Sequence, residues 1–168
     1  MSDVTPGLEH SWSFPSAVFP APPSFHFSAP TEWVADPRTG TDAAVRLDSG
    51  PDAFAPNVLI SSARIAGSRD TILAAQSASV SSLEGVEVLD EIDLDVAGIG
   101  WHLWEYAFTD PRVGTGVQLA AIALTGAAPV IHTVSVAASV TADRAPEVLP
   151  TIRAILQSIS INERQVQS

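Results

Sequence analysis

The sequence predicts an α+β domain in which a mainly antiparallel sheet of about six strands is flanked by two helices. Several segments alternate apolar and polar residues with the two-residue period of a strand, whereas two others repeat apolar residues at three and four positions, the period of a helix. Some strands carry apolar residues on both faces, and an antiparallel sheet needs this only when both faces are covered. The 168 residues suit one domain, and the 46% hydrophobic content excludes a disordered chain.

The domain is expected at residues 25–161, between a proline-punctuated arm at residues 1–24 and a polar tail at residues 162–168. The arm contains apolar side chains that we expect either to pack onto the sheet or to dock onto a partner: Trp12, Phe14, Val18 and Phe19. Strands are predicted at residues 25–30, 43–47, 57–65, 86–96, 99–108, 117–124 and 130–140. Helices are predicted from Ser68 or Asp70, either of which can cap the first turn, to about Leu83, and from near Asp143 to about Ile159.

Residues 86–108, VEVLDEIDLDVAGIGWHLWEYAF, predict two long strands joined by a two-residue turn at Ala97-Gly98. In the first strand an apolar set alternates with an acidic set, so we expect an apolar face toward the core and an acidic face outward. The apolar set is Val86, Val88, Ile92, Leu94 and Val96; the acidic set is Glu87, Glu91, Asp93 and Asp95. The turn would place Leu94 opposite Trp101, Asp93 opposite His102, Glu91 opposite Trp104 and Leu89 opposite Tyr106.

The charge of the chain restricts its partners. All 8 basic residues are arginine, and they face 19 acidic residues, which gives a net charge of −11. Nucleic acids and anionic membranes are polyanions, so neither is expected as a partner, whereas a basic protein is. Cysteine is absent, which excludes disulfides and thiolate chemistry. Because we find neither a signal peptide nor an apolar run long enough for a membrane helix, we expect a cytoplasmic protein without direct membrane insertion.

The sequence contains no recognisable motif of catalysis or cofactor binding. There is no GxSxG nucleophile elbow, and Gly114-Thr115-Gly116 lacks the lysine and the length of a phosphate-binding loop. The carboxylates of the acidic strand lack the glycine spacing of a calcium loop. His102 opposite Asp93 is the one suggestive acid–base pair, and neighbours of this kind often meet by chance. The sequence therefore predicts no catalytic residue, no metal and no cofactor.

An aromatic cluster gives the best candidate for a functional surface. Trp104, Tyr106 and Phe108 are expected on one face of their strand, beside acidic residues of the neighbouring strand. Aromatic side chains rimmed by carboxylates would suit a basic or amphipathic protein segment. The predicted partner-binding set is Trp104, Tyr106, Phe108, Glu87, Glu91, Asp93 and His102. The alternative is that a helix or the N-terminal arm covers this face.

A family resemblance rests on the order and spacing of several segments between about Phe25 and Ile161. They are Phe27-Ser28-Ala29-Pro30-x-x-Trp33, Ala55-Pro56-Asn57-Val58-Leu59-Ile60, Ile65-Ala66-Gly67, Val96-Ala97-Gly98-Ile99-Gly100-Trp101 and Ile155-Leu156-Gln157-Ser158-Ile159. The sequence resembles the actinobacterial LpqN-like proteins of the Mog1/PsbP-like fold, which also includes DcrB-type proteins and type VI secretion effector chaperones. The resemblance implies an α/β/α sandwich and a non-enzymatic domain that binds proteins or small ligands. LpqN-like members often have a signal peptide and an acylated cysteine, and we find neither here.

Three functions remain open from the sequence. The favoured one is a non-enzymatic protein-binding module, such as a cytoplasmic adaptor or chaperone for a secreted or membrane-destined partner. The second is a carrier of a small apolar ligand or lipid, and the third, least favoured, is an enzyme. The sequence does not define the partner or the oligomeric state.

Overall fold

The structure, a computed structural model, describes residues 21–50, 53–111 and 114–162. The strands are β1 (Ser24–His26), β2 (Trp33–Ala35), β3 (Ala43–Leu47), β4 (Asn57–Ala66), β5 (Glu87–Val96), β6 (Ile99–Asp110), β7 (Gly114–Ala127), β8 (Val130–Thr141) and β9 (Ser160–Asn162). The helices are α1 (Arg69–Ser81) and α2 (Ala145–Gln157). The apolar side chains of the arm at positions 12 to 19, expected to pack onto the sheet or to dock onto a partner, lie outside the described residues.

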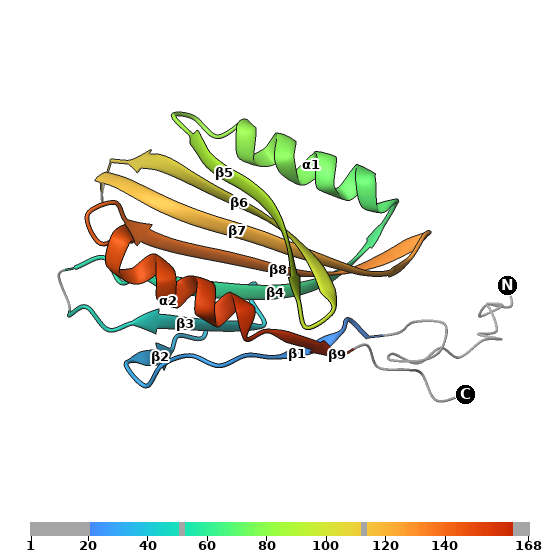
Figure 1. Ribbon diagram of the computed structural model, residues 1–168, viewed down its shortest axis with the longest axis horizontal. Helices are drawn as coiled ribbons and strands as arrows, with labels where there is room; N and C mark the ends of the chain where they lie inside the picture. Colours follow the sequence, from blue (N-terminus) through green and yellow to red (C-terminus); the bar gives the residue numbers. More distant parts are fainter. Residues whose placement is uncertain (1–20, 51–52, 112–113, 163–168) are drawn as a thin grey trace, which may run out of the picture.

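Seven strands form one antiparallel sheet in the order β2-β3-β4-β8-β7-β6-β5, and β1 pairs with β9 in a separate two-stranded sheet (Figure 1). The predicted α+β class is therefore confirmed, with seven strands in the main sheet instead of about six. The first predicted strand does not join this sheet. Its partner β9 was missed because three residues are too few to show a period; it follows the predicted end of the last helix and takes in Asn162, the first residue of the predicted tail.

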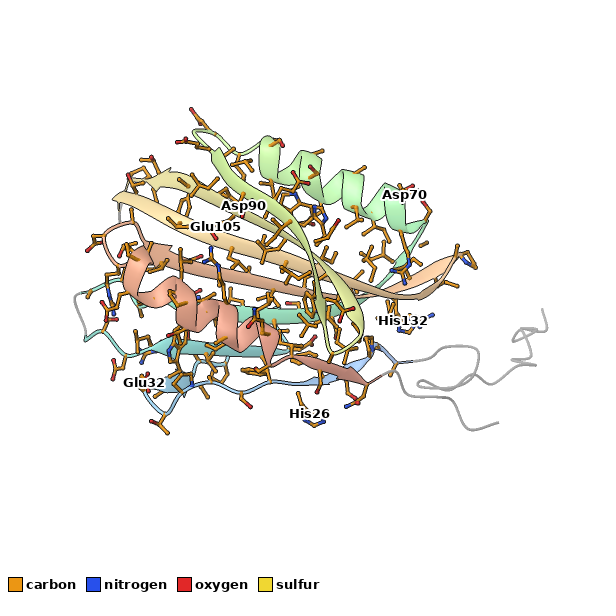
Figure 2. All side chains as sticks on the ribbon, viewed as in Figure 1. His26, Glu32, Asp70, Asp90, Glu105 and His132 are labelled. Carbon is orange, nitrogen blue, oxygen red and sulfur yellow. The ribbon has the colours of Figure 1, made fainter. Side chains whose placement is uncertain are left out.

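The two helices lie on opposite faces of the sheet (Figure 1), and side chains fill the space between each helix and the strands (Figure 2). The larger core joins α2 to one face and contains, among others, Trp101, Leu119, Val136, Ile152 and Ile155. The smaller core joins α1 to the other face and contains Ile72, Val80, Trp104, Tyr106, Ala120, Ile122, Leu124 and Ile131. Apolar residues on both faces of a strand thus correspond to a helix on each side, as the sequence predicted.

Each helix begins close to the residue at which the sequence predicted it. Ser68 is the N-cap of α1, and its hydroxyl accepts a hydrogen bond from the backbone N–H of Thr71 at 3.2 Å. Helix α2 begins at Ala145 with Pro146 in its first turn and continues through Pro150. On the side facing the sheet, Arg153 of α2 forms an ion pair with Glu105 of β6, which is 8% exposed. This pair neutralises the one acidic side chain that the described part of the core contains.

The pairing of β5 with β6 confirms the predicted register from the turn as far as Glu91↔Trp104. Beyond that point the register shifts between Val88 and Asp90, so Val88, and not Leu89, lies opposite Tyr106. The bulge inserts one unpaired residue and reverses the faces of the side chains that precede it. Val88 therefore lies on the α1 face and Glu87 on the α2 face. The predicted single apolar face of residues 86–96 is wrong at its N-terminal end.

The turn between β5 and β6 has both central residues in the left-handed region, Ala97 at φ +53° and Gly98 at φ +81°. This is the backbone of a type I′ turn, for which asparagine followed by glycine is preferred, and an alanine there is strained by its Cβ atom. Ala97→Asn is therefore expected to raise the free energy of unfolding by about 0.5–1 kcal/mol in denaturant titrations. An unchanged or lower stability would contradict this assignment of the turn.

Candidate functional site

The aromatic cluster predicted to bind a partner is covered by α1. Trp104 and Tyr106 are 2% and 4% exposed, and both pack against the helix in the smaller core. Phe108 is half-buried and lies directly opposite Gly116 on β7. A Cβ atom on Gly116 would come within 2.6 Å of the Phe108 ring. The alternative that a helix covers this face therefore describes the structure, and a partner could reach the two buried rings only after α1 had moved.

The acidic residues of the predicted set are divided between the two faces of the sheet. Glu91 and Asp93 lie opposite Trp104 and His102 on the α1 face, as expected. Glu87 lies opposite Ala107 and so points to the α2 face, because the bulge precedes Glu91. The structure therefore brings Glu91, Asp93 and His102 together and separates Glu87 from them.

His102 joins the two carboxylates. Its Nδ1 lies 2.6 Å from Asp93 Oδ1 and its Nε2 lies 2.8 Å from Glu91 Oε1, while its ring makes an edge contact with Trp104 at 4.3 Å between centroids. The ring thus bridges the two carboxylates, and both of its nitrogens are engaged. These contacts hold Glu91 and Asp93 in place on the α1 face of β5.

Burial raises the pKa of Tyr106, the only tyrosine in the chain, above the ordinary value of about 10 because the phenolate would lose its hydration under α1. A tyrosine whose pKa is raised by folding binds its proton more tightly in the folded state. The unfolded state therefore loses this proton first as the pH rises.

We expect the free energy of unfolding to decrease as the pH rises above about 10, and the tyrosinate absorbance of the folded protein to develop at higher pH than that of the unfolded protein. Tyr106→Phe removes this contribution and serves as the control. Coincident titration of the folded and unfolded proteins would contradict burial of the phenol.

The outer edge of β5 forms an exposed surface that was not predicted from the sequence as a binding site. Strand β5 is the last strand of the seven-stranded sheet, and its residues 87–93 are all exposed. Three of its large apolar side chains are 40–49% exposed: Val88, Leu89 and Ile92. The same strand carries five carboxylates and no basic residue: Glu87, Asp90, Glu91, Asp93 and Asp95. Adjacent apolar and acidic pairs at residues 88–91 broke the strand period and could have signalled this exposed, bulged edge.

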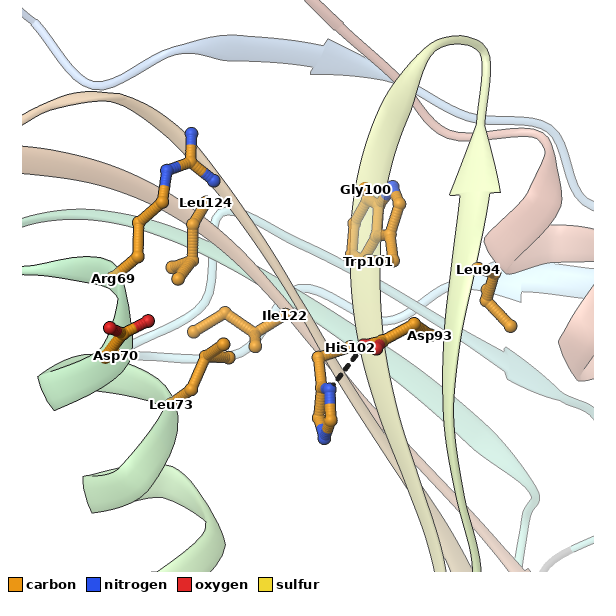
Figure 3. Close-up of a pocket in the computed structure, with 10 residues that line it drawn as sticks. All are labelled: Arg69, Asp70, Leu73, Asp93, Leu94, Gly100, Trp101, His102, Ile122 and Leu124. Carbon is orange, nitrogen blue, oxygen red and sulfur yellow. Dashed lines mark hydrogen bonds and ion pairs between the residues drawn. The ribbon is translucent and has the colours of Figure 1, made fainter.

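Two adjoining clefts lie beside the first turn of α1. One, of about 250 Å³, separates α1 from the β5–β6 hairpin, with Leu73, Ile122 and Leu124 among its apolar residues and His102 and Asp93 on its far wall (Figure 3). The other, of about 470 Å³, lies between the tips of the β5–β6 and β7–β8 hairpins. Arg69, Gly100 and Leu124 line both. Neither cleft could be predicted from the sequence, because each depends on how the two hairpins separate.

Within residues 21–50, 53–111 and 114–162, no helix is both long and apolar enough to cross a membrane. In the same part of the chain, no group of three or more histidine and acidic side chains is arranged to hold a metal ion.

Comparison with known proteins finds likeness in structure only. No protein-family model matches the chain, and no curated protein matches it in sequence. The solved structure of LpqN from Mycobacterium tuberculosis, described as involved in cell envelope biogenesis, is similar with a TM-score of 0.71 and 12% identity over 86% of both chains. Cyanobacterial PsbP from Synechocystis is similar with a TM-score of 0.56 and 14% identity, over 92% of this chain and 99% of that one.

A Pseudomonas aeruginosa protein of unknown function also matches, with a TM-score of 0.52 and 14% identity over 80% of this chain and 94% of its own. Identities this low establish a shared fold and leave function open. The fold implied by the sequence resemblance is confirmed. The chain has the LpqN-like, PsbP/Mog1-like fold.

Proposed function

We propose that the protein is a non-enzymatic binding module that takes up an extended, basic segment of another protein along the open edge of β5. The observation that supports this is the combination, on one exposed edge strand, of three exposed apolar side chains and five carboxylates. An antiparallel edge strand directs alternate backbone N–H and C=O groups outward, where an added strand can bind them. Backbone hydrogen bonds would supply affinity, and the side chains would select the partner.

The charge of this edge favours one kind of partner. A second copy of the chain would bring five carboxylates against five others, and like charges facing each other across a strand pair are destabilising. Acidic side chains and a bulge are also the usual protection of an edge against self-association. A segment in which arginine or lysine alternates with apolar residues would instead complement both features of β5. Carboxylates at the rim would chiefly accelerate its association.

A cytoplasmic adaptor or chaperone for a secreted or membrane-destined protein is the role we propose for such a module, because these partners pass through an extended state before they fold or insert. The acidic edge would hold a basic segment in that state. The engagement of both His102 nitrogens supports a non-enzymatic role, since this is the one acid–base pair suggested by the sequence.

The test uses a blocked ten-residue peptide, the length of β5, in which valine and arginine alternate. We expect it to bind the full chain, with an affinity that weakens as salt is added, and we expect a valine–glutamate peptide of the same length not to bind. Glu87→Gln together with Glu91→Gln is expected to slow association and to flatten its salt dependence. Equal binding of both peptides, or of neither, would overturn the proposal.

A second candidate function, the carrier of a small ligand, is supported by the two clefts at the first turn of α1. Their volumes, about 250 and 470 Å³, approach or fall within the range of roughly 300–1,000 Å³ in which small ligands usually bind. The smaller cleft shares only Asp93 and Leu94 with β5, and the larger cleft shares none of its lining residues with that strand. Either function can therefore hold without the other.

A further inference from the structure

The register of β5 determines which of its backbone groups face outward. In antiparallel strands, residues opposite each other alternate between pairs that exchange both backbone hydrogen bonds and pairs that exchange none, and the pair flanking a two-residue turn is of the first kind. Val96↔Ile99 is that pair. Counting back from it, the residues whose N–H and C=O groups point away from β6 are Glu91, Asp93 and Asp95. These residues offer the groups that an added strand would bind.

One of these outward groups is already occupied. The backbone N–H of Glu91 donates a hydrogen bond to Oδ1 of Asp90 at 2.9 Å. A short acidic side chain that binds a neighbouring backbone group in this way competes with strand pairing. Within the described part of the chain, the outward N–H groups of Asp93 and Asp95 have no such contact. The outer edge of β5 is therefore open toward the turn and capped at Glu91.

The side chains of the open stretch are sorted by face. Glu91, Asp93 and Asp95 lie on the α1 face, whereas Ile92 and Leu94 lie on the α2 face. Figure 3 shows Asp93 and Leu94 on opposite sides of β5. A strand that pairs with this stretch therefore meets a carboxylate at every second position and an apolar side chain at each position between.

Two of these carboxylates are held in place and still accessible. His102 contacts one oxygen atom of Glu91 and one of Asp93, at 2.8 Å and 2.6 Å. The side chains of Glu91 and Asp93 are 47% and 86% exposed, respectively. The second oxygen atom of each carboxylate is thus left to a basic side chain of a partner. Because the ring fixes both carboxylates beforehand, less side-chain freedom is lost on binding.

Beyond Asp90 the order of the faces is reversed. The register shift between Val88 and Asp90 puts Val88 on the α1 face and Glu87 on the α2 face. A segment whose basic side chains follow the α1 face would there bring a basic side chain against Val88 and an apolar one against Glu87. The cap and the reversal of the faces thus end the matching stretch at the same residue.

We propose that Asp90 limits the binding edge, so that the partner pairs with residues 91–95 and its pairing ends where the Asp90 carboxylate occupies the N–H of Glu91. This inference rests on the proposed function and names the part of β5 that the segment binds. The partner that fits is a stretch of five residues in which basic and apolar side chains alternate, with a basic one at each end. Its basic side chains lie over the α1 face, and its apolar ones pack beside Ile92 and Leu94.

The first experiment needs no partner and measures backbone amide exchange of the full chain, residue by residue, by NMR. It compares wild type with Asp90→Ala, which removes the cap and the charge, and with Asp90→Asn, which removes the charge and keeps a carbonyl oxygen as acceptor. Asp90 is exposed, so neither change disturbs the core.

Relative to an unstructured peptide, the Glu91 amide of the wild type should exchange about fivefold more slowly than the amides of Asp93 and Asp95, the effect of one backbone hydrogen bond. Asp90→Ala should abolish this difference, and Asp90→Asn should retain it.

The second experiment adds the valine–arginine peptide to the same three proteins. Asp90→Ala frees one backbone donor, so we expect the peptide to dissociate from it about fivefold more slowly than from wild type. It should dissociate from Asp90→Asn within about twofold of the wild-type rate. Charge alone would act in the opposite direction, because removal of a carboxylate weakens the attraction of a basic peptide.

A Glu91 amide no better protected than those of Asp93 and Asp95, or equal dissociation of the peptide from wild type and Asp90→Ala, would overturn the assignment of Asp90. New protection of residues 87–89 by the peptide in the wild type would overturn the limit to residues 91–95 and leave the proposed function intact. Absence of peptide binding in all three proteins would overturn the proposed function, whereas exchange at Glu91 would still decide whether Asp90 caps the edge.

Discussion

Trp101→Ala and Trp104→Ala are each expected to lower the free energy of unfolding by about 3–5 kcal/mol, the usual cost of removing a large buried aromatic side chain. The two rings lie on opposite faces of β6 and are 1% and 2% exposed. Trp101 packs in the core that includes α2, and Trp104 packs in the core that includes α1. One strand thus fixes both helices to the sheet, and losing either ring leaves a cavity beneath a helix.

Chemical denaturation with unchanged slope would measure this loss as a shift of the midpoint. The result for Trp104 separates two accounts of the aromatic cluster. If Trp104 were a partner contact on an open face, its truncation would change stability little and partner binding strongly. A small change in the midpoint of Trp104→Ala would therefore contradict its burial beneath α1.

Ile92→Lys is expected to weaken binding of the valine–arginine peptide at least about tenfold. Ile92 lies near the middle of β5 and is 40% exposed. A lysine there removes apolar contact area and opposes a basic segment. The substitution should cost the free protein little, because lysine is common on exposed edge strands.

Val34→Lys is the matched control, since Val34 is 39% exposed and lies on β2, the edge strand at the other end of the same sheet. It should bind the peptide as wild type does. Equal weakening in both variants would mean that the peptide responds only to the overall charge, and no weakening in Ile92→Lys would place the binding surface elsewhere.

The β5–β6 hairpin shows why much of the fold could be predicted from the sequence. Alternation through Ile92, Leu94 and Val96, followed by a turn at Ala97-Gly98, determines a register because a slip of one residue would reverse every side chain. Where that alternation stops, at Val88 and Leu89, the register prediction fails. Strand β9 was missed for the related reason that a three-residue strand carries no period.

The candidate site was harder to predict, because it depends on tertiary packing. The alternation of the sequence predicts that Trp104 and Tyr106 lie on one face of β6. It does not predict that α1 packs over that face. Conversely, the apolar residues of β5 indicate a core strand by their pattern, and they are exposed because no further strand follows β5 in the described sheet. The two clefts beside the first turn of α1 depend on the separation of two hairpins, which cannot be predicted from a local sequence pattern.

Hydrogen–deuterium exchange of the full chain, with and without the valine–arginine peptide, tests the proposed binding edge most directly. Backbone amides of β5 that point away from β6 have no partner strand in the described structure, and an added strand would protect them. We expect new protection confined to residues 87–96. Protection in α1 or around Trp104 and Tyr106, with β5 unchanged, would contradict the account.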